Sequence, residues 1–156
     1  MENFHQETVR ENMSRPVRTV APEMTLGDLL RLFSADDFAA YPVVRNETLV
    51  GTVSRADALR PFPAKAGGDV LDFDAIMGTT IEQIMSSRIT KVELDATLEQ
   101  AAQLMAAEAS ESLPVVDRQN RVRGIIARDD VIRALARDTW RSSLPLELRP
   151  MGYAIA

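Results

Sequence analysis

One short segment of the chain, Gly51 to Asp57, combines groups suited to a phosphorylated sugar. A carboxylate such as Asp57 offers only acceptors, so it can accept hydrogen bonds from two vicinal ribose hydroxyls. Arg55 supplies a guanidinium, which suits phosphate, and Ser54 supplies a hydroxyl. Because Arg55 stands where a helix is expected to begin, backbone N–H groups also favour an anion there. The segment therefore predicts a ribose-binding corner.

The chain repeats this segment at Gly124 to Asp130, where Arg128 and Asp130 are the basic and acidic residues. Ala127 stands where the first copy has a serine, so the second copy lacks the hydroxyl. We therefore expect two unequal sites, with a phosphate-bearing ligand bound more tightly at the first. The missing hydroxyl leaves ribose binding possible at the second.

A structural role would explain the same residues without a ligand. Ser54 and Asp57 are both residue types that cap helices, and an arginine between them could simply be solvated. Capping needs a single such residue, whereas this segment places a hydroxyl and an acid three positions apart. At the level of the sequence, both interpretations stay open.

The similarity between the two segments extends over most of the chain. An offset of 72 residues aligns Met13 with Met85 and Thr8 with Thr80. The same offset aligns Val17 with Ile89, Val20 with Val92, Thr25 with Thr97, and Tyr41–Val44 with Leu113–Val116. Polar positions align as well as apolar ones, which hydrophobic patterning alone would not produce. The chain is therefore interpreted as two repeats.

Each repeat predicts the same order of elements. A short helix is expected to begin at each of the capping boxes Thr8-x-x-Glu11 and Thr80-x-x-Gln83. In such a box the threonine hydroxyl and the side chain three residues later accept hydrogen bonds from free backbone N–H groups. A short extended run follows, and then a longer amphipathic helix that also starts at a threonine. Two strands and a closing helix complete the repeat.

The strands are expected to flank polar turns. In the first repeat they span 41–44 and 49–53, and in the second they lie on either side of 117–121. Their continuous apolar runs suggest burial on both faces. Prolines cut the first closing helix short, whereas the second can run from Arg128 to about Arg137.

Composition limits the function classes. The chain has 156 residues, 46% hydrophobic and 26% charged, as in an ordinary soluble protein. A net charge of −5 disfavours a general nucleic-acid binder. Since there is no cysteine and His5 is the single histidine, we expect no disulfide, thiol catalysis or Cys- or His-based metal site. With no secretory signal and no run of ~20 apolar residues, we expect a cytoplasmic protein without a membrane span.

The sequence divides into four parts. We expect a first repeat at 1–60, a linker at 61–79, a second repeat at 80–137 and a C-terminal extension at 138–156. The linker contains prolines, paired glycines and acids. The extension is too apolar for a free tail, so we expect it to pack on the body or on another subunit.

Taken together, the two x-Pro-Val-Val strands and the pattern Gly-h-h-Ser/Thr-x-x-Asp, where h is apolar, resemble a tandem pair of CBS domains, often called a Bateman module. The second copy departs from this pattern at Ala127, where the family prefers threonine or serine. The resemblance covers roughly residues 8 to 137. It implies an α+β fold in which two βαββα repeats pack about a pseudo-twofold axis. It also implies two clefts between the repeats that bind an adenosine compound such as AMP, ADP, ATP or S-adenosylmethionine, with no obligatory cofactor and no metal.

The resemblance implies a role for each candidate residue. Asp57 and Asp130 would bind ribose hydroxyls, and Ser54 would help to position the ribose or phosphate. Arg55 and Arg128 are the phosphate candidates from the chemistry described above. The base-holding wall would comprise Val17, Ile89, Tyr41, Pro42, Leu113 and Pro114.

Three functions compete at this stage. The leading one is a stand-alone regulatory module that senses an adenosine ligand and is not an enzyme, with an unidentified protein as a possible target. The alternative is a structural or interaction module that acts by dimerisation with empty clefts, and the third is a nucleotide-processing enzyme. We expect a homodimer formed through the long helices, where Leu29, Leu32 and Phe33 offer apolar surface. The small residues Ala101, Ala102, Ala106 and Ala107 would allow two helices to approach closely.

Overall fold

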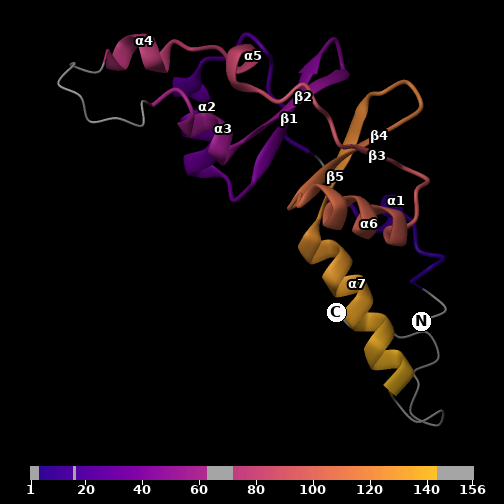
Figure 1. Ribbon diagram of the computed structural model, residues 1–156. Helices are drawn as coiled ribbons and strands as arrows, with labels where there is room; N and C mark the ends of the chain where they lie inside the picture. Colours follow the sequence, from indigo (N-terminus) through magenta and orange to yellow (C-terminus); the bar gives the residue numbers. More distant parts are fainter. Residues whose placement is uncertain (1–3, 16, 63–71, 144–156) are drawn as a thin grey trace.

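The computed structural model describes residues 4–15, 17–62 and 72–143, and its elements form two lobes (Figure 1). The first lobe contains α2 (Leu26–Ala35), β1 (Ala40–Arg45), β2 (Thr48–Ser54), α3 (Arg55–Leu59), α4 (Phe73–Met77) and α5 (Ile81–Ile84). The second contains α1 (Val9–Asn12), β3 (Val92–Glu93), α6 (Leu98–Glu108), β4 (Ser112–Val116), β5 (Val122–Ala127) and α7 (Arg128–Ser143). This mixture of helices and strands in two repeats confirms the predicted α+β class.

Each lobe is built on an antiparallel strand pair. Ala40 lies opposite Ser54 in β1–β2, and Ser112 lies opposite Ala127 in β4–β5. In the second lobe β3 adds to β4 in parallel, whereas in the first lobe Val20 makes an isolated parallel bridge to β1. Each closing helix begins directly after its strand pair, so equivalent corners of the two lobes carry the segments singled out in the sequence.

Burial along β2 differs from the expectation for the strands. Its residues alternate between buried and half-buried positions, so this strand is not buried on both faces. The reason is that the pair is antiparallel, and an antiparallel sheet can leave one face partly open to water.

The opening helices are exchanged between the lobes. Val9 of α1 is fully buried in the core of the second lobe, and Ile81 of α5 is fully buried in the core of the first. The N–H of Leu98 donates to the carbonyl of Glu7 at 3.0 Å, which ties α1 to α6. Each sequence repeat therefore contributes to both lobes, and the chain passes from one lobe to the other after each opening helix.

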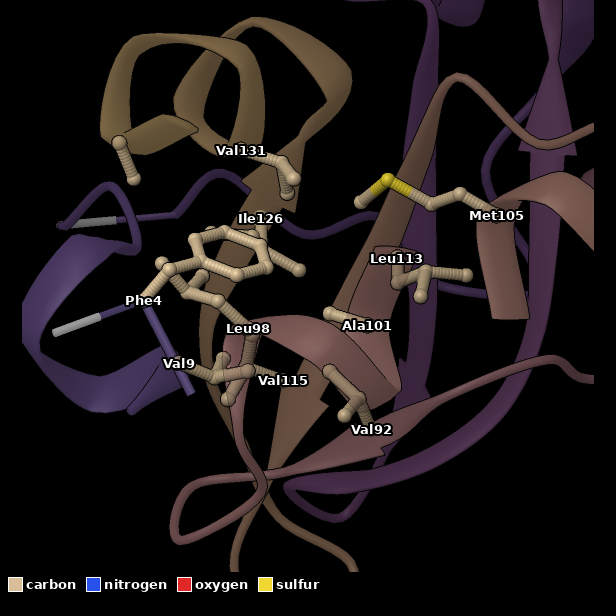
Figure 2. Close-up of a cluster of buried hydrophobic side chains, with 11 residues drawn as sticks. Phe4, Val9, Val92, Leu98, Ala101, Met105, Leu113, Val115, Ile126 and Val131 are labelled. Atoms are coloured by element: carbon tan, nitrogen blue, oxygen red, sulfur yellow. The ribbon is translucent and has the colours of Figure 1, made fainter. Parts of the chain in front are cut away.

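Figure 2 shows the consequence in the core of the second lobe. Phe4 and Val9 come from the N-terminal segment and lie against Leu98, Leu113 and other residues more than 80 positions away in the sequence. Burying a leucine or phenylalanine side chain contributes roughly 1.5–3 kcal/mol. The N-terminal segment is therefore an integral part of this core.

The predicted capping boxes start the helices as expected. Thr8 pairs with Glu11 at the start of α1, and Thr80 pairs with Gln83 at the start of α5. At α6, Thr97 caps in the same way with Gln100. These local signals were readable because both members of each box lie within four residues of one another.

Two boundaries differ from those drawn on the sequence. The closing helix α7 runs to Ser143, not to about Arg137, because no proline or glycine interrupts it before that residue. The end of the expected linker forms the short helix α4, capped by Asp72. Linker residues 63–71 and extension residues 144–156 lie outside the described part of the chain.

Candidate functional site

A cleft of about 630 Å³ opens beside the end of β2 and has walls from both lobes. The first lobe supplies β1, the end of β2 and the start of α3. The second lobe supplies the segment that follows α5 and the residues before β4. We call it the first cleft, and its polar lining includes Thr52, Ser54, Arg55, Asp57, Ser86, Arg88, Thr90, Glu108, Ser110, Glu111 and Ser112.

Ser54 and Asp57 form a capping box at this cleft. Ser54 Oγ accepts the N–H of Asp57 at 3.1 Å, and Asp57 Oδ2 accepts the N–H of Ser54 at 2.9 Å. The other oxygen, Oδ1, pairs with the Arg60 guanidinium at 2.9 Å. One oxygen of the carboxylate therefore serves the cap, and the other contacts a side chain that is itself 60% exposed.

Arg55 lies on the cleft wall with its guanidinium bonded to the backbone. It donates to the carbonyls of Phe33, Phe38 and Asp36 at 2.9–3.0 Å, and it stacks 4.9 Å from the centre of the Phe33 ring. These contacts use several of its donors. The side chain therefore ties α3 to the end of α2 as well as lining the cleft.

A second cleft of about 490 Å³ lies at the equivalent corner of the other lobe. Asp130 Oδ2 accepts the N–H of Ala127 at 2.8 Å, which reproduces half of the capping box in the first repeat. Its Oδ1 pairs with Arg133 at 2.6 Å. The lining of this second cleft includes Ser14, Asp37, Phe38, Glu111, Ala127, Arg128, Asp129, Asp130 and Arg133.

Arg128 has a different partner from its counterpart in the first repeat. Its guanidinium pairs with Glu111 at 2.9 Å, and its backbone N–H donates to the Glu111 carbonyl at 2.9 Å. The equivalent backbone bond in the first repeat runs from Arg55 to Ala39. Because alanine replaces glutamate at that position, the two arginines make different side-chain contacts.

The two clefts adjoin one another. Their linings share Ala39, Ala40, Arg55, Glu111, Ser112 and Ile125. The shared residues lie just before or at the start of β1 and β4, within β5, and at the start of α3. A ligand in one cleft would therefore touch residues that also shape the other.

The predicted base-holding wall is only partly brought to the clefts. Pro42, Pro114 and Tyr41 line the first cleft. Leu113, by contrast, is fully buried in the core of the second lobe, because alternate residues of β4 face inward. Val17 lines a separate hollow among arginines of α1 and the β4–β5 turn. Ile89 is absent from the residues described as lining any of these three hollows.

Several lining residues escaped the sequence interpretation. Ser86 and Thr90 follow the second opening helix, and Ser110 and Ser112 precede β4. A signal for them existed, because the repeat offset places Ser14 at the equivalent position of the second cleft. These residues could be recognised only once the crossing of the chain between the lobes was known, because that crossing brings the loops close to the motif aspartates.

Tyr41 is held at the back of the first cleft. Its hydroxyl donates to Asp36 Oδ2 at 3.0 Å, and Arg18 pairs with the same oxygen at 3.2 Å. Burial of the ring, followed by the hydrogen bond to Asp36, raises the pKa of Tyr41 to about 12. The hydroxyl therefore stays protonated at neutral pH and acts as a fixed donor.

Residues 4–15, 17–62 and 72–143 contain neither a cluster of possible metal ligands nor a helix suited to spanning a membrane. In that part of the chain, no group of three or more His, Cys, Asp or Glu side chains could hold a metal ion. None of the helices there is long and apolar enough to cross a membrane.

Comparison with known proteins identifies the repeats. The family profile described as "CBS domain" matches residues 8–63 and 81–137. The CBS domain-containing protein YhcV of Bacillus subtilis (strain 168) is 31% identical over 125 residues, which is 80% of this chain and 82% of YhcV. Several other curated relatives, from Methanocaldococcus jannaschii, are longer, and the chain spans 22–48% of their length.

Two solved structures show the same arrangement. The crystal structure of CBSX2 in complex with AMP has a TM-score of 0.71 and 27% identity, covering 85% of this chain and 98% of that one. The cytosolic domain of the Mg2+ channel MgtE in complex with ATP has a TM-score of 0.67 and 25% identity, covering 85% of this chain and 50% of that one. These similarities bear out the interpretation of the chain as two tandem repeats.

Proposed function

We propose, since the chain belongs to the CBS domain family as a tandem pair, that it binds an adenosine-containing ligand in the two adjoining clefts. The candidates are AMP, ADP, ATP and S-adenosylmethionine. The binding would regulate another activity, and the chain itself would not be an enzyme.

The placement of the two motif aspartates carries the proposal. Asp57 and Asp130 each lie on a cleft wall, with Oδ2 held by a backbone N–H and Oδ1 paired with an exposed arginine. A ribose offers two vicinal hydroxyls to such a carboxylate, whose Oδ1 becomes available when the exposed arginine turns away. A hydrogen bond to a charged acceptor is worth about 1.5–3 kcal/mol, so each aspartate could anchor a ribose.

The rest of the first cleft suits the other parts of a nucleotide. Pro42, Pro114 and Ile125 supply apolar surface for a flat base, and Ser54, Ser86 and Thr90 supply hydroxyls. Complexes of two similar proteins with AMP and ATP support this assignment.

A regulatory role follows from where the clefts lie. Each is lined by residues of both lobes, so a bound ligand would favour one arrangement of the lobes over others. That shift could then be sensed by a protein target.

A structural or interaction module remains the second candidate. One observation favours it: Leu59 on α3 and Ile132 on α7 are 62% and 58% exposed, although both are large apolar residues. Under this alternative the protein would act by dimerisation and the clefts would bind no adenosine compound.

Thermal unfolding with added compounds tests the proposal. A ligand at one hundred times its Kd adds about 2.7 kcal/mol to the stability of the native state. For a domain of this size, that gain raises the Tm by several degrees. We expect a rise with at least one of AMP, ADP, ATP and S-adenosylmethionine, and none with inosine or free ribose at equal concentration. No rise with any adenosine compound would favour the interaction module.

A further inference from the structure

The second cleft contains an arginine to which neither the sequence motif nor the family comparison assigns a role. Arg133 lies on its wall and pairs with Asp130 Oδ1 at 2.6 Å. The Asp130 side chain is 9% exposed, whereas that of Arg133 is 69% exposed. Arg133 Nε also donates to the Asp129 carbonyl at 3.3 Å. The ion pair therefore joins a fixed carboxylate to the end of a largely exposed guanidinium.

The first repeat has an arginine at the same place but with different access. Arg60 pairs with Asp57 through the same three-residue spacing. However, its guanidinium also donates to the Ile84 carbonyl, and Arg60 is not among the residues that line the first cleft. Arg60 therefore ties α3 to α5, whereas Arg133 faces the space in which a ligand would lie.

Charge pairing in the second cleft distinguishes Arg133 from the other arginines there. Arg55 is bonded to three backbone carbonyls. Arg128 is paired with Glu111, which is not the motif aspartate that is expected to bind the ribose. Arg133 is paired with the same carboxylate that the ribose needs. A ribose that takes Asp130 Oδ1 would therefore release this guanidinium next to itself.

We propose that Arg133 makes the second cleft selective for ligands that carry a phosphate. This inference rests on the proposed function. When ribose hydroxyls replace it at Asp130, the guanidinium turns to the phosphate of the same ligand, which suits its planar array of donors. A nucleoside without phosphate breaks the ion pair between Arg133 and Asp130 and provides no new partner for the guanidinium. Arg133 thereby supplies the phosphate contact that the missing hydroxyl at Ala127 cannot.

The test measures AMP and adenosine binding at each cleft separately. The amide N–H of Ala127 donates to Asp130, and that of Ser54 donates to Asp57, so their NMR signals report the second and the first cleft. In the parent protein we expect AMP to bind the second cleft more tightly than adenosine. In Arg133→Gln we expect this preference to fall by about tenfold, the scale of one charge-assisted hydrogen bond. Adenosine affinity should hold or rise.

Arg137→Gln is the matched control. Arg137 lies one turn further along α7 and pairs with Glu7, away from the cleft. Its replacement should leave the AMP preference unchanged. Because Arg133 is highly exposed, its variants should fold, and Arg133→Lys, which keeps the charge without the planar fork, should give an intermediate preference.

The outcomes separate this inference from the function on which it rests. An unchanged AMP preference in Arg133→Gln, with both compounds still bound, would overturn the role of Arg133 and leave the nucleotide site standing. If neither compound shifts either amide in the parent, the proposed function fails and the role of Arg133 fails with it.

Discussion

Asp57 performs two tasks that a single substitution can separate. Its Oδ2 completes the cap of α3, and its Oδ1 faces Arg60 at the edge of the first cleft. Asp57→Ala removes both, so we expect a loss of about 0.5–2 kcal/mol in stability and of most of the stabilisation by AMP. Asp57→Asn can keep the bond to the Ser54 N–H but loses the charged acceptor, so its stability should stay closer to the parent while its AMP affinity falls.

Unfolding in urea with and without AMP measures both effects. If Asp57→Asn gains as much stability from AMP as the parent does, Asp57 does not hold the ribose by its charge. The sequence alone left capping and ligand binding open, and the structure shows that the cap exists without excluding the ligand.

Ala127 offers the converse test at the second cleft. Its N–H bonds to Asp130 just as the N–H of Ser54 bonds to Asp57, and both residues end a strand and precede a helix. Ala127→Ser should therefore complete a capping box and stabilise α7 by about 1 kcal/mol. Denaturant midpoints of the parent and variant check this. An unstable variant would mean that the backbone at Ala127 does not match that at Ser54.

The carboxylate of Asp117 is expected to make the stability of the fold depend on pH. Burial acts to raise its pKa, but N–H donors of Arg121, Arg123 and Gln119 outweigh this and hold the pKa at about 2, below the ordinary 3.8. A depressed pKa means that the native state prefers the charged form. The stabilisation is therefore present above pH 4 and is lost as the pH falls through about 2.

Asp117→Asn isolates that contribution. The variant should be less stable than the parent at pH 6, and the difference should shrink as the pH falls from about 4 to 2. Urea unfolding at a series of pH values measures it. A difference that stays constant over this range would show that the carboxylate charge does not matter.

At the scale of elements, the sequence predicted where helices begin better than it predicted which elements pack together. The capping boxes at Thr8 and Thr80 lie within a few residues and mark helix starts correctly. The capping boxes could not show that α1 packs in the second lobe, because an apolar residue such as Val9 fits either core. The same limit hid the lining residues after α5, since they reach the cleft only through the exchange.

The exchanged segments pass close over the strands, and two glycines allow this. A Cβ at Gly51 would lie 2.9 Å from the Ser86 carbonyl oxygen, and one at Gly124 would lie 2.9 Å from that of Ser14. Backbone hydrogen bonds between Thr52 and Ser86 hold the first crossing. The equivalence of the two sites shows that each exchange needs a glycine in the strand beneath it.

Gly51→Ala should strain this crossing. Because the clash is with a backbone atom, the segment must move, and overpacking of this kind costs roughly 1–3 kcal/mol. The move would also displace Ser86 at the wall of the first cleft, so AMP affinity there should fall. Gly27→Ala is a suitable control, since a Cβ there meets its nearest atom at 3.6 Å. Equal stability of Gly51→Ala and the parent in urea would contradict the argument.

At the scale of the whole molecule, part of the surface that was expected to pair two copies lies inside the lobes. Of the residues expected to pair two copies, Leu29, Phe33 and Ala101 are buried in the cores, Leu32 and Ala102 are half-buried, and Ala106 and Ala107 are exposed. The helical pattern could not distinguish a face that packs within a lobe from one that packs between molecules, since both are apolar. Among the residues whose burial is described, the large apolar ones that are exposed are Leu59, Phe73, Ile132 and Leu135.

Two of these residues occupy the same place in the two repeats. Leu59 of α3 and Ile132 of α7 each come two residues after the motif aspartate, and each is more than half exposed. Duplication of an exposed apolar position gives the surface an internal symmetry, which a second copy of the chain can match. We therefore expect a homodimer that buries both closing helices.

Charges at these positions should break the pairing. Leu59→Asp combined with Ile132→Asp should halve the mass measured by light scattering at micromolar concentration while leaving the circular dichroism unchanged, because neither side chain is in a core. Phe73→Asp tests an exposed apolar residue outside the closing helices, since Phe73 is also 58% exposed but lies on α4, far from α7 in Figure 1. A parent of monomeric mass would refute the dimer, and a double variant that stays dimeric would place the interface on another face.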